Sequence, residues 1–253
     1  FRFGDKDGGS DTQKVGAFTL AAFSGGIDGV GPIDMGATVS GANSGDDTKI
    51  IYITPSIAGF NAVVSYAPHV GSQGNDLSGT QSSNPKDLFE GGIAYRGNFG
   101  GVGVITSVIG HYGWFESTTP AGTDSGQAGS GETWKVYGGA VVDISGFRLG
   151  GGIGTGQGIA ANQSGGALFE RGSDVSWYNL GAAAKLGPAN VSLTYGQVFD
   201  GSQGSTGRSR EPWEVVLGAD FGVAPGLVVG GELVYFNNSG DSFSQGGAGR
   251  TDE

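Results

Sequence analysis

Residues 132–158 read ETWKVYGGAVVDISGFRLGGGIGTGQG, and this stretch carries the pattern that decides the fold. Trp134 and Val136 alternate with Lys135 and Tyr137, and the alternation continues to the Ser-Gly pair at 145–146. Successive side chains of a β-strand point to opposite faces, so the pattern predicts a strand with one apolar face and one face that carries the charges. The alternation resumes after the Ser-Gly pair, which predicts a β-hairpin.

The glycine-rich run at 150–158 invites comparison with a nucleotide-binding loop. Its spacing does not satisfy the Gly-x-Gly-x-x-Gly pattern, and it continues the strand alternation of Phe147 and Leu149 against Arg148. We therefore interpret these glycines as small residues of a strand that leave room on its inward face.

The same period of two recurs along the chain and predicts an all-β, antiparallel fold. In 213–222 and 227–235 the acidic residues fall on one face only. The predicted strands span residues 1–4, 48–54, 60–67, 87–97, 102–115, 132–144, 147–158, 174–186, 190–199, 211–222 and 227–237.

The connections between these strands alternate between short and long. Short turns are expected at 55–59, 97–101, 145–146, 187–190 and 222–226, and long polar stretches at 69–86, 116–131, 159–173, 200–210 and from 238 onward. Strict alternation places all turns at one end of a barrel and all long loops at the other. This arrangement is typical of transmembrane up-and-down β-barrels, whereas a soluble sandwich has no reason to sort its loops in this way.

Composition supports a membrane barrel over an ordinary soluble domain. The chain has 54 glycines, no cysteine and 15% charged residues, yet 37% of its residues are hydrophobic. Each glycine costs about 1 kcal/mol relative to alanine inside a helix, so long helices are not expected. The net charge of -11 argues against nucleic acid as a partner. No apolar run reaches the length of about 18 residues that a transmembrane helix needs.

Aromatic residues on the apolar face fall at two levels, as two membrane interfaces require. An alternative is that they form the rims of a soluble core. Those toward the long-loop ends are Tyr112, Trp114, Trp134, Tyr178, Trp213 and Tyr235, and those beside the short turns are Phe60, Phe99, Phe147 and Phe221.

Two motifs resemble a known family. IYITPSIAGFNAVVSYAP at 51–68 resembles the strand, turn and strand that follow the constriction loop of general bacterial diffusion porins, especially the alphaproteobacterial type. FRFGDKDGG at 1–9 is similar to the strand end that leads into that loop. The resemblance implies a trimer of sixteen-stranded barrels in the outer membrane of a Gram-negative bacterium, with the third external loop folded inward.

In that register, residues 1–4 end strand five and residues 227–237 form strand fifteen. The chain is then expected to be an internal fragment, one incomplete barrel domain over 1–253 with a constriction loop at 5–47. Family members end in an aromatic residue, whereas this chain ends in Asp252-Glu253, which we interpret as a truncation.

The expected function is a water-filled channel for passive diffusion of ions and small hydrophilic solutes. Outer-membrane lipid and lipopolysaccharide are the expected surroundings, and a homotrimer is the assembly that the resemblance implies. We expect no enzyme activity, because His69 and His111 have no catalytic neighbours in sequence. No cofactor is expected, although calcium or another divalent ion at the surface stays open. The alternatives are a substrate-selective outer-membrane channel and a secreted glycine-rich β-solenoid with a surface or adhesion role.

The expected constriction residues are one base on the wall and four acids of the loop. The resemblance implies that a basic wall faces an acidic loop across the pore, and Arg2 is the member of that wall in this chain. Asp46 and Asp47 have an alternative role, as a turn that starts the next strand. The set is Arg2, Asp28, Asp34, Asp46 and Asp47.

Nine further charged residues are expected to line the pore, because a Lys or Arg facing lipid costs about 2–4 kcal/mol at the midplane whereas the lumen is wet. They are Glu90, Arg96, Lys135, Asp143, Arg148, Lys185, Glu214, Asp220 and Glu232. The four bases of this set are expected near the turn ends, where lining a periplasmic vestibule is the alternative role.

Overall fold

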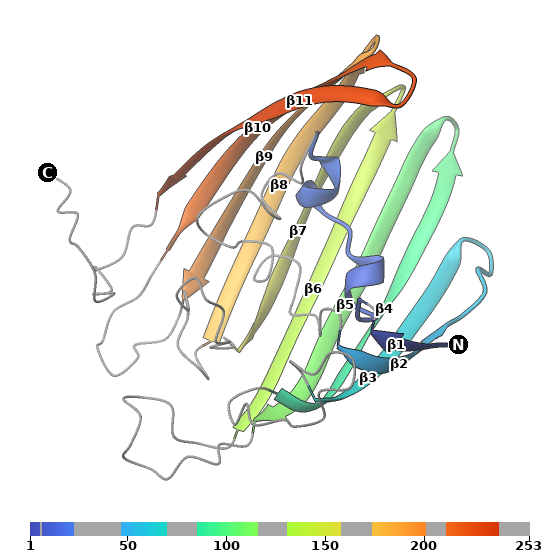
Figure 1. The fold of residues 1–253 in the computed structure, drawn as a ribbon, viewed down its shortest axis with the longest axis vertical. Coiled ribbons are helices and arrows are strands. Elements are labelled where there is room, and N and C mark those ends of the chain that lie inside the picture. Colours follow the sequence, from blue (N-terminus) through green and yellow to red (C-terminus); the bar gives the residue numbers. More distant parts are fainter. Residues whose placement is uncertain are drawn as a thin grey trace, which may run out of the picture.

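The structure is a computed structural model that describes residues 1–5, 7–22, 47–69, 85–115, 131–157, 174–200 and 211–237. Its strands form one antiparallel sheet in which each strand pairs with its neighbours in sequence (Figure 1). The strands are β1 (Arg2–Asp5), β2 (Thr48–Ile53), β3 (Phe60–His69), β4 (Pro85–Phe99), β5 (Val102–Phe115), β6 (Gly131–Ile144), β7 (Phe147–Gln157), β8 (Asp174–Leu186), β9 (Ala189–Asp200), β10 (Trp213–Ala224) and β11 (Leu227–Asn237).

All eleven predicted strands are confirmed, and their ends differ from the prediction by at most two residues. The up-and-down antiparallel order is also confirmed. The helical elements in the described chain are two 3-10 turns, η1 (Asp11–Gln13) and η2 (Ala17–Leu20). Among the described residues no helix is both long and apolar enough to cross a membrane.

The strand register assigns each residue to one of two faces. A row of directly paired residues runs from Ile51 through Ser65, Glu90 and His111 to Lys135, across β2 to β6. All five side chains of this row are buried. Directly paired residues point to the same side of a sheet, so this row and its alternate neighbours define one face, which we call the inner face.

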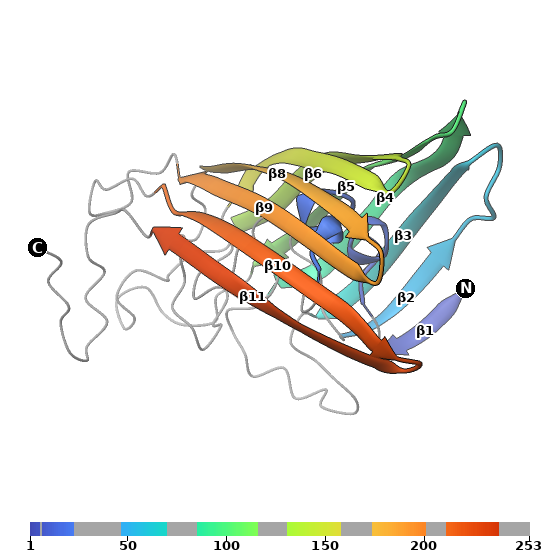
Figure 2. The ribbon, with the colours of Figure 1, turned by 90° about the horizontal axis from the view of Figure 1, so that it is seen from above.

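The opposite face, called the outer face, exposes large apolar side chains. Ile153 is 70% exposed, Leu233 69% and Val108 58%, although each lies in the middle of a strand. Soluble monomers rarely expose contiguous apolar patches of more than a few hundred Å². The sheet curves, and its inner face is the concave one (Figure 2).

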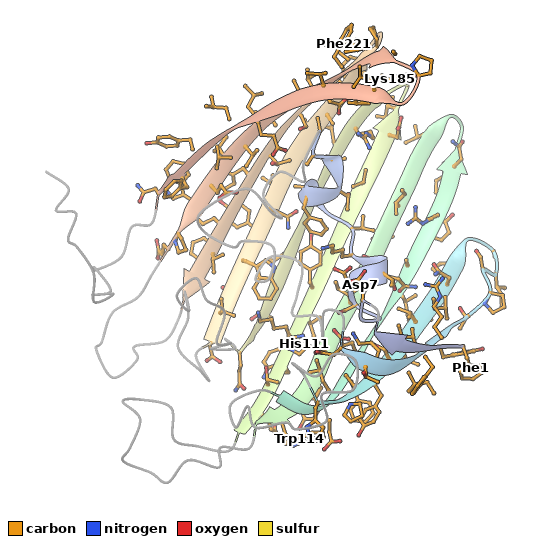
Figure 3. All side chains as sticks on the ribbon, in the orientation of Figure 1. Phe1, Asp7, His111, Trp114, Lys185 and Phe221 are labelled. Carbon is orange, nitrogen blue, oxygen red and sulfur yellow. The ribbon has the colours of Figure 1, made fainter. Side chains whose placement is uncertain are left out.

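Aromatic residues of the outer face lie at two levels, as predicted. Trp213 packs on Tyr235 at the long-loop end with ring centroids 5.4 Å apart, and Phe60 packs on Tyr95 by the short turns at 4.7 Å. Trp114 and Phe221 lie at opposite ends of the sheet (Figure 3). The two levels therefore mark the two edges of the apolar band.

The short turn at 145–146 has the backbone expected of a two-residue hairpin. Ser145 has φ 54° and Gly146 has φ 89°, so both residues are in the left-handed region that a type I′ turn requires. The long polar connections lie outside the described residues.

Candidate functional site

Residues 7–22, which we call the inward segment, lie across the inner face of the sheet. In both views the segment runs inside the curve of the strands (Figures 1 and 2). Its two 3-10 turns are each supported by a threonine, since Thr12 Oγ1 donates to Gly9 O at 3.0 Å and Thr19 Oγ1 to Gly16 O at 2.7 Å.

The first half of the inward segment is hydrogen-bonded to β3 and β4. The Gly9 N–H donates to Ser65 Oγ at 2.8 Å, and Ser10 Oγ donates to Glu90 Oε1 at 3.0 Å. Ser65 Oγ in turn donates to the other oxygen of Glu90 at 3.2 Å. Glu90 therefore accepts hydrogen bonds from the wall and from the segment, although it is only 2% exposed. Hydrogen bonds to a buried carboxylate reduce the cost of taking its charge out of water.

The second half of the segment is hydrogen-bonded to β8 and β9. The Ala17 N–H donates to Asn179 Oδ1 at 2.7 Å, and the amide of Asn179 donates to Tyr137 Oη at 2.9 Å. The Ala22 N–H donates to Ser192 Oγ at 2.8 Å. A backbone N–H that is buried without a partner is costly, so these side chains fix the position of the segment.

Apolar contacts also hold the inward segment against the inner face. Ala17 and Phe18 pack in a buried cluster with Tyr137 and Trp177, and Leu20 packs with Val141 in a second cluster. The glycines of the wall make room for these contacts. A Cβ added at Gly181 would lie 3.0 Å from Ala17 Cβ, and one added at Gly150 would lie 3.3 Å from Leu20 Cδ1. The interpretation of the run at 150–158 as small strand residues is confirmed for residues 150–157.

Replacing Asn179 by Leu should loosen the inward segment without removing apolar volume from the wall. The buried Ala17 N–H loses its acceptor, which costs about 1–3 kcal/mol. We expect amide hydrogen exchange at Ala17 to accelerate by about tenfold for each 1.4 kcal/mol. Asn190→Leu is the matched control, because Asn190 donates to Asp220 and not to the segment. Equal exchange rates at Ala17 in the two variants would contradict this role of Asn179.

The predicted constriction residues fall partly within the described chain. Arg2 lies on the inner face of β1, since it pairs with Ile51, and its side chain is exposed. Asp47 directly precedes β2 and is 3% exposed. Asp28, Asp34 and Asp46 lie outside the described residues. The role of all five in a constriction stays a prediction.

The nine residues that were predicted to line a pore all lie on the inner face by register. Glu90, Lys135 and Glu214 are buried there, while the other six are partly or well exposed. The expected position of Lys135 near a turn end is wrong. It is the fifth residue of β6, in the half of the strand that faces the long connections, and its ammonium lies 5.6 Å from the ring centroid of Trp177. The assignment of the nine residues to the inner face follows from the residue pairings between neighbouring strands of β4 to β11.

Sequence reasoning missed Ser65, Asn179 and Ser192, the polar residues that hold the inward segment. Each is an uncharged polar residue at an inner-face position of its strand. That pattern was available in the sequence, but nothing in it states which backbone group each residue meets. The described residues contain no group of three or more His, Cys, Asp or Glu that is arranged to hold a metal ion.

Comparisons with known proteins agree with this geometry. A family described as Gram-negative porin matches residues 1–241. The anion-selective porin from Comamonas acidovorans is similar with a TM-score of 0.60 and 17% identity, over 94% of this chain and 63% of that one. The trimer form of OmpT, an outer-membrane protein of Vibrio cholerae, gives 0.57 and 15% over 93% and 65%. The outer-membrane channel DcaP of Acinetobacter baumannii gives 0.58 and 12% over 93% and 65%.

These likenesses show the fold alone, and together with the family match they confirm the predicted fold class, a transmembrane antiparallel β-barrel. The chain spans less than two thirds of the length of each of these three structures. No curated protein matches the chain.

Proposed function

The chain belongs to the Gram-negative porin family and is an outer-membrane protein, and from this premise we propose that the whole protein is a water-filled channel for passive diffusion of ions and small hydrophilic solutes. The observation that carries the proposal is the division of one curved sheet into two unlike faces. The outer face exposes apolar side chains such as Ile153 and Leu233. The inner face carries charged residues along β4 to β11, whereas the outer-face acids Glu132 and Asp174 lie at strand ends beside the long connections.

This division is the reverse of a soluble barrel, whose inside is apolar. Lipid tolerates apolar side chains and excludes Lys and Arg, whereas a wet lumen tolerates both. The concave face of the sheet therefore faces water, and water inside a barrel is a path for solutes.

We propose further that residues 5–47 form the constriction of this channel. The described part of that stretch supports the proposal, because the inward segment is hydrogen-bonded to the wall at both of its halves, through Glu90 and Asn179. In this proposal Arg2 stands on the wall, and Asp28, Asp34, Asp46 and Asp47 belong to the loop, with Asp47 directly before β2. Opposite charges across a narrow pore would set its ion preference.

The proposed assembly is a homotrimer in outer-membrane lipid and lipopolysaccharide. The trimer form of OmpT supports this oligomeric state by analogy. The proposed channel carries out no catalysis and holds no cofactor, and surface calcium remains a proposal without a site. A substrate-selective channel is the second candidate function, and it is favoured by a cavity on the inner face that Arg96 and Arg148 line.

Planar bilayers test the proposed channel directly. The natural full-length protein should give stepwise, ohmic conductance increments in KCl, since a diffusion pore has no gate to close. Protein that was heat-denatured before addition is the matched control and should give no steps. A folded protein that gives no steps at any voltage would refute the channel.

A further inference from the structure

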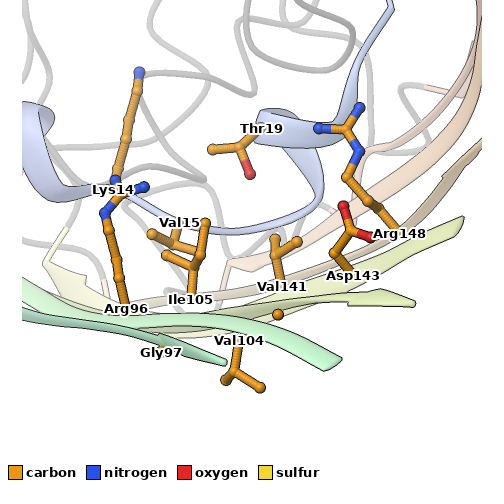
Figure 4. A pocket seen from close by; sticks show the side chains of 11 residues that line it. Lys14, Val15, Thr19, Arg96, Gly97, Val104, Ile105, Val141, Asp143 and Arg148 are labelled. Atoms are coloured by element: carbon orange, nitrogen blue, oxygen red, sulfur yellow. The ribbon is translucent and has the colours of Figure 1, made fainter. Parts of the chain in front are cut away.

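A cavity of about 500 Å³ lies between the inward segment and the inner face of β4 to β7 (Figure 4). It is near the turn ends of the strands, because Arg96 lies close to the end of β4 and Arg148 at the start of β7. Neither residue was predicted to meet the inward segment. The cavity brings both together with Lys14 and Thr19 of that segment.

The charge around this cavity is positive, although the chain as a whole carries -11. Lys14 is balanced by Asp11, with Nζ and Oδ1 2.9 Å apart. Arg96 and Arg148 have no ion pair or side-chain hydrogen bond within the described residues. Asp143 is the carboxylate that lines the cavity, and its Oδ1 accepts the Gly146 N–H at 3.2 Å.

The two guanidinium groups stand on either side of an apolar floor (Figure 4). Arg96 pairs with Ile105 and Ile105 pairs with Val141, so these three residues form one row across three strands. Arg148 lies on the next strand, two positions closer to its turn than the residue that pairs with Val141. Strands are about 4.8 Å apart, so the Cα atoms of the two arginines are roughly 15 Å apart. Val15 of the inward segment adds to the apolar lining.

We propose that this cavity is a binding station for small organic carboxylates on their way through the channel. A guanidinium is weakly hydrated and presents paired donors that match a carboxylate. The floor of Val15, Ile105 and Val141 offers contact to an apolar body, which inorganic anions lack. This inference rests on the proposed channel function, because the cavity lies on the inner face, which lines the lumen in that proposal.

The assignment goes beyond general electrostatics in one respect. A diffuse positive field would favour every small anion alike, whereas two guanidiniums beside an apolar floor favour an anion with an apolar part. Benzoate should therefore bind better than acetate, which carries the same carboxylate and the same charge but a much smaller apolar body. The difference between these two probes separates the two interpretations.

The test measures block of single-channel current by added benzoate in planar bilayers, with the full-length protein. Wild type should show a concentration-dependent reduction of the KCl current. Arg96→Gln with Arg148→Gln should raise the half-blocking concentration by about tenfold or more, since hydrogen bonds to charged groups are lost. Asp143→Asn should lower it, because the variant removes a negative charge while its side-chain oxygen can still accept from Gly146. The opposite signs of these changes exclude a general loss of folding.

Lys185→Gln is the matched control, since Lys185 is a base on the same face that does not line the cavity. Its half-blocking concentration should rise much less than that of the double arginine variant, because Lys185→Gln removes one charge of the wall and no contact of the cavity. Block that is equal for benzoate and acetate, or unchanged in the double arginine variant, would overturn the binding station while the channel itself stands. Absence of current steps in KCl alone would instead refute the proposed function.

Discussion

Replacing Leu233 by Arg should remove most of the folded, membrane-inserted protein. Leu233 is 69% exposed on the outer face, and it lies in the middle of β11 opposite Leu217. An arginine at this position would face hydrocarbon at the depth where its charge is most costly. The expected loss is about 2–4 kcal/mol in the free energy of insertion and folding. A loss of that size is a large part of the stability of an ordinary protein domain.

Glu232→Arg is the matched control, because it places the same side chain one residue away on the inner face. The free energy of unfolding of each variant is measured by urea titration in lipid vesicles. The loss in free energy of unfolding relative to wild type should be about 2–4 kcal/mol for Leu233→Arg and much smaller for Glu232→Arg. Similar losses in the two variants would mean that the two faces of β11 do not differ in environment, and the assignment of lipid and lumen would then be wrong.

The strands of this chain were predictable from sequence because their signal is local. Alternation along 132–144 and 147–158 fixes both faces of β6 and β7, and the two-residue turn at 145–146 fixes their register. A slip of one residue would turn Leu149 and Ile153 to the inner face and the charged residues to the outer face, so the difference between the two faces leaves little freedom in the pairing. The exposed apolar outer face follows from the same alternation.

The inward segment was less predictable, because its contacts are distant in sequence. Ala17 meets Asn179 across 162 residues, and Ala22 meets Ser192 across 170. The residues of the two 3-10 turns show no periodic pattern of hydrophobic side chains that would distinguish them from an irregular loop in the sequence. The misplacement of Lys135 has a different origin, because the predicted strand 132–144 begins within one residue of β6 and already places Lys135 beside the long connection that precedes the strand.

The glycines of the inner face are visible in the local strand pattern, and they also mark where the distant inward segment packs. Sequence alone suggests that small inner-face residues leave room for something, and the structure identifies what occupies that room at Gly139, Gly150 and Gly181. At Gly139 the occupant is the carbonyl oxygen of Val15. Backbone atoms cannot rotate away as a flexible side chain can. This contact is therefore the strictest constraint on the position of the inward segment against the wall.

Replacing Gly139 by Val should displace the inward segment and widen the channel. The new Cβ would overlap the Val15 carbonyl oxygen, and only movement of the segment relieves the overlap. Overpacking of this kind costs about 1–3 kcal/mol, which shifts the balance between docked and displaced segment by roughly 5- to 150-fold. We expect larger single-channel conductance and faster entry of large sugars into liposomes.

Gly138→Val is the control that separates displacement from a general effect of valine in β6. Gly138 lies on the outer face, and a Cβ there would have ordinary contacts at 3.8 Å, to Ser107 O and Val108 Cγ2. This variant should keep the conductance and the sugar exclusion of wild type. If Gly139→Val also keeps both while its folding is intact, the inward segment does not narrow the path of solutes. The proposal of a constriction at 5–47 would then lose its main support, because the inward segment would lie against the wall without narrowing the lumen.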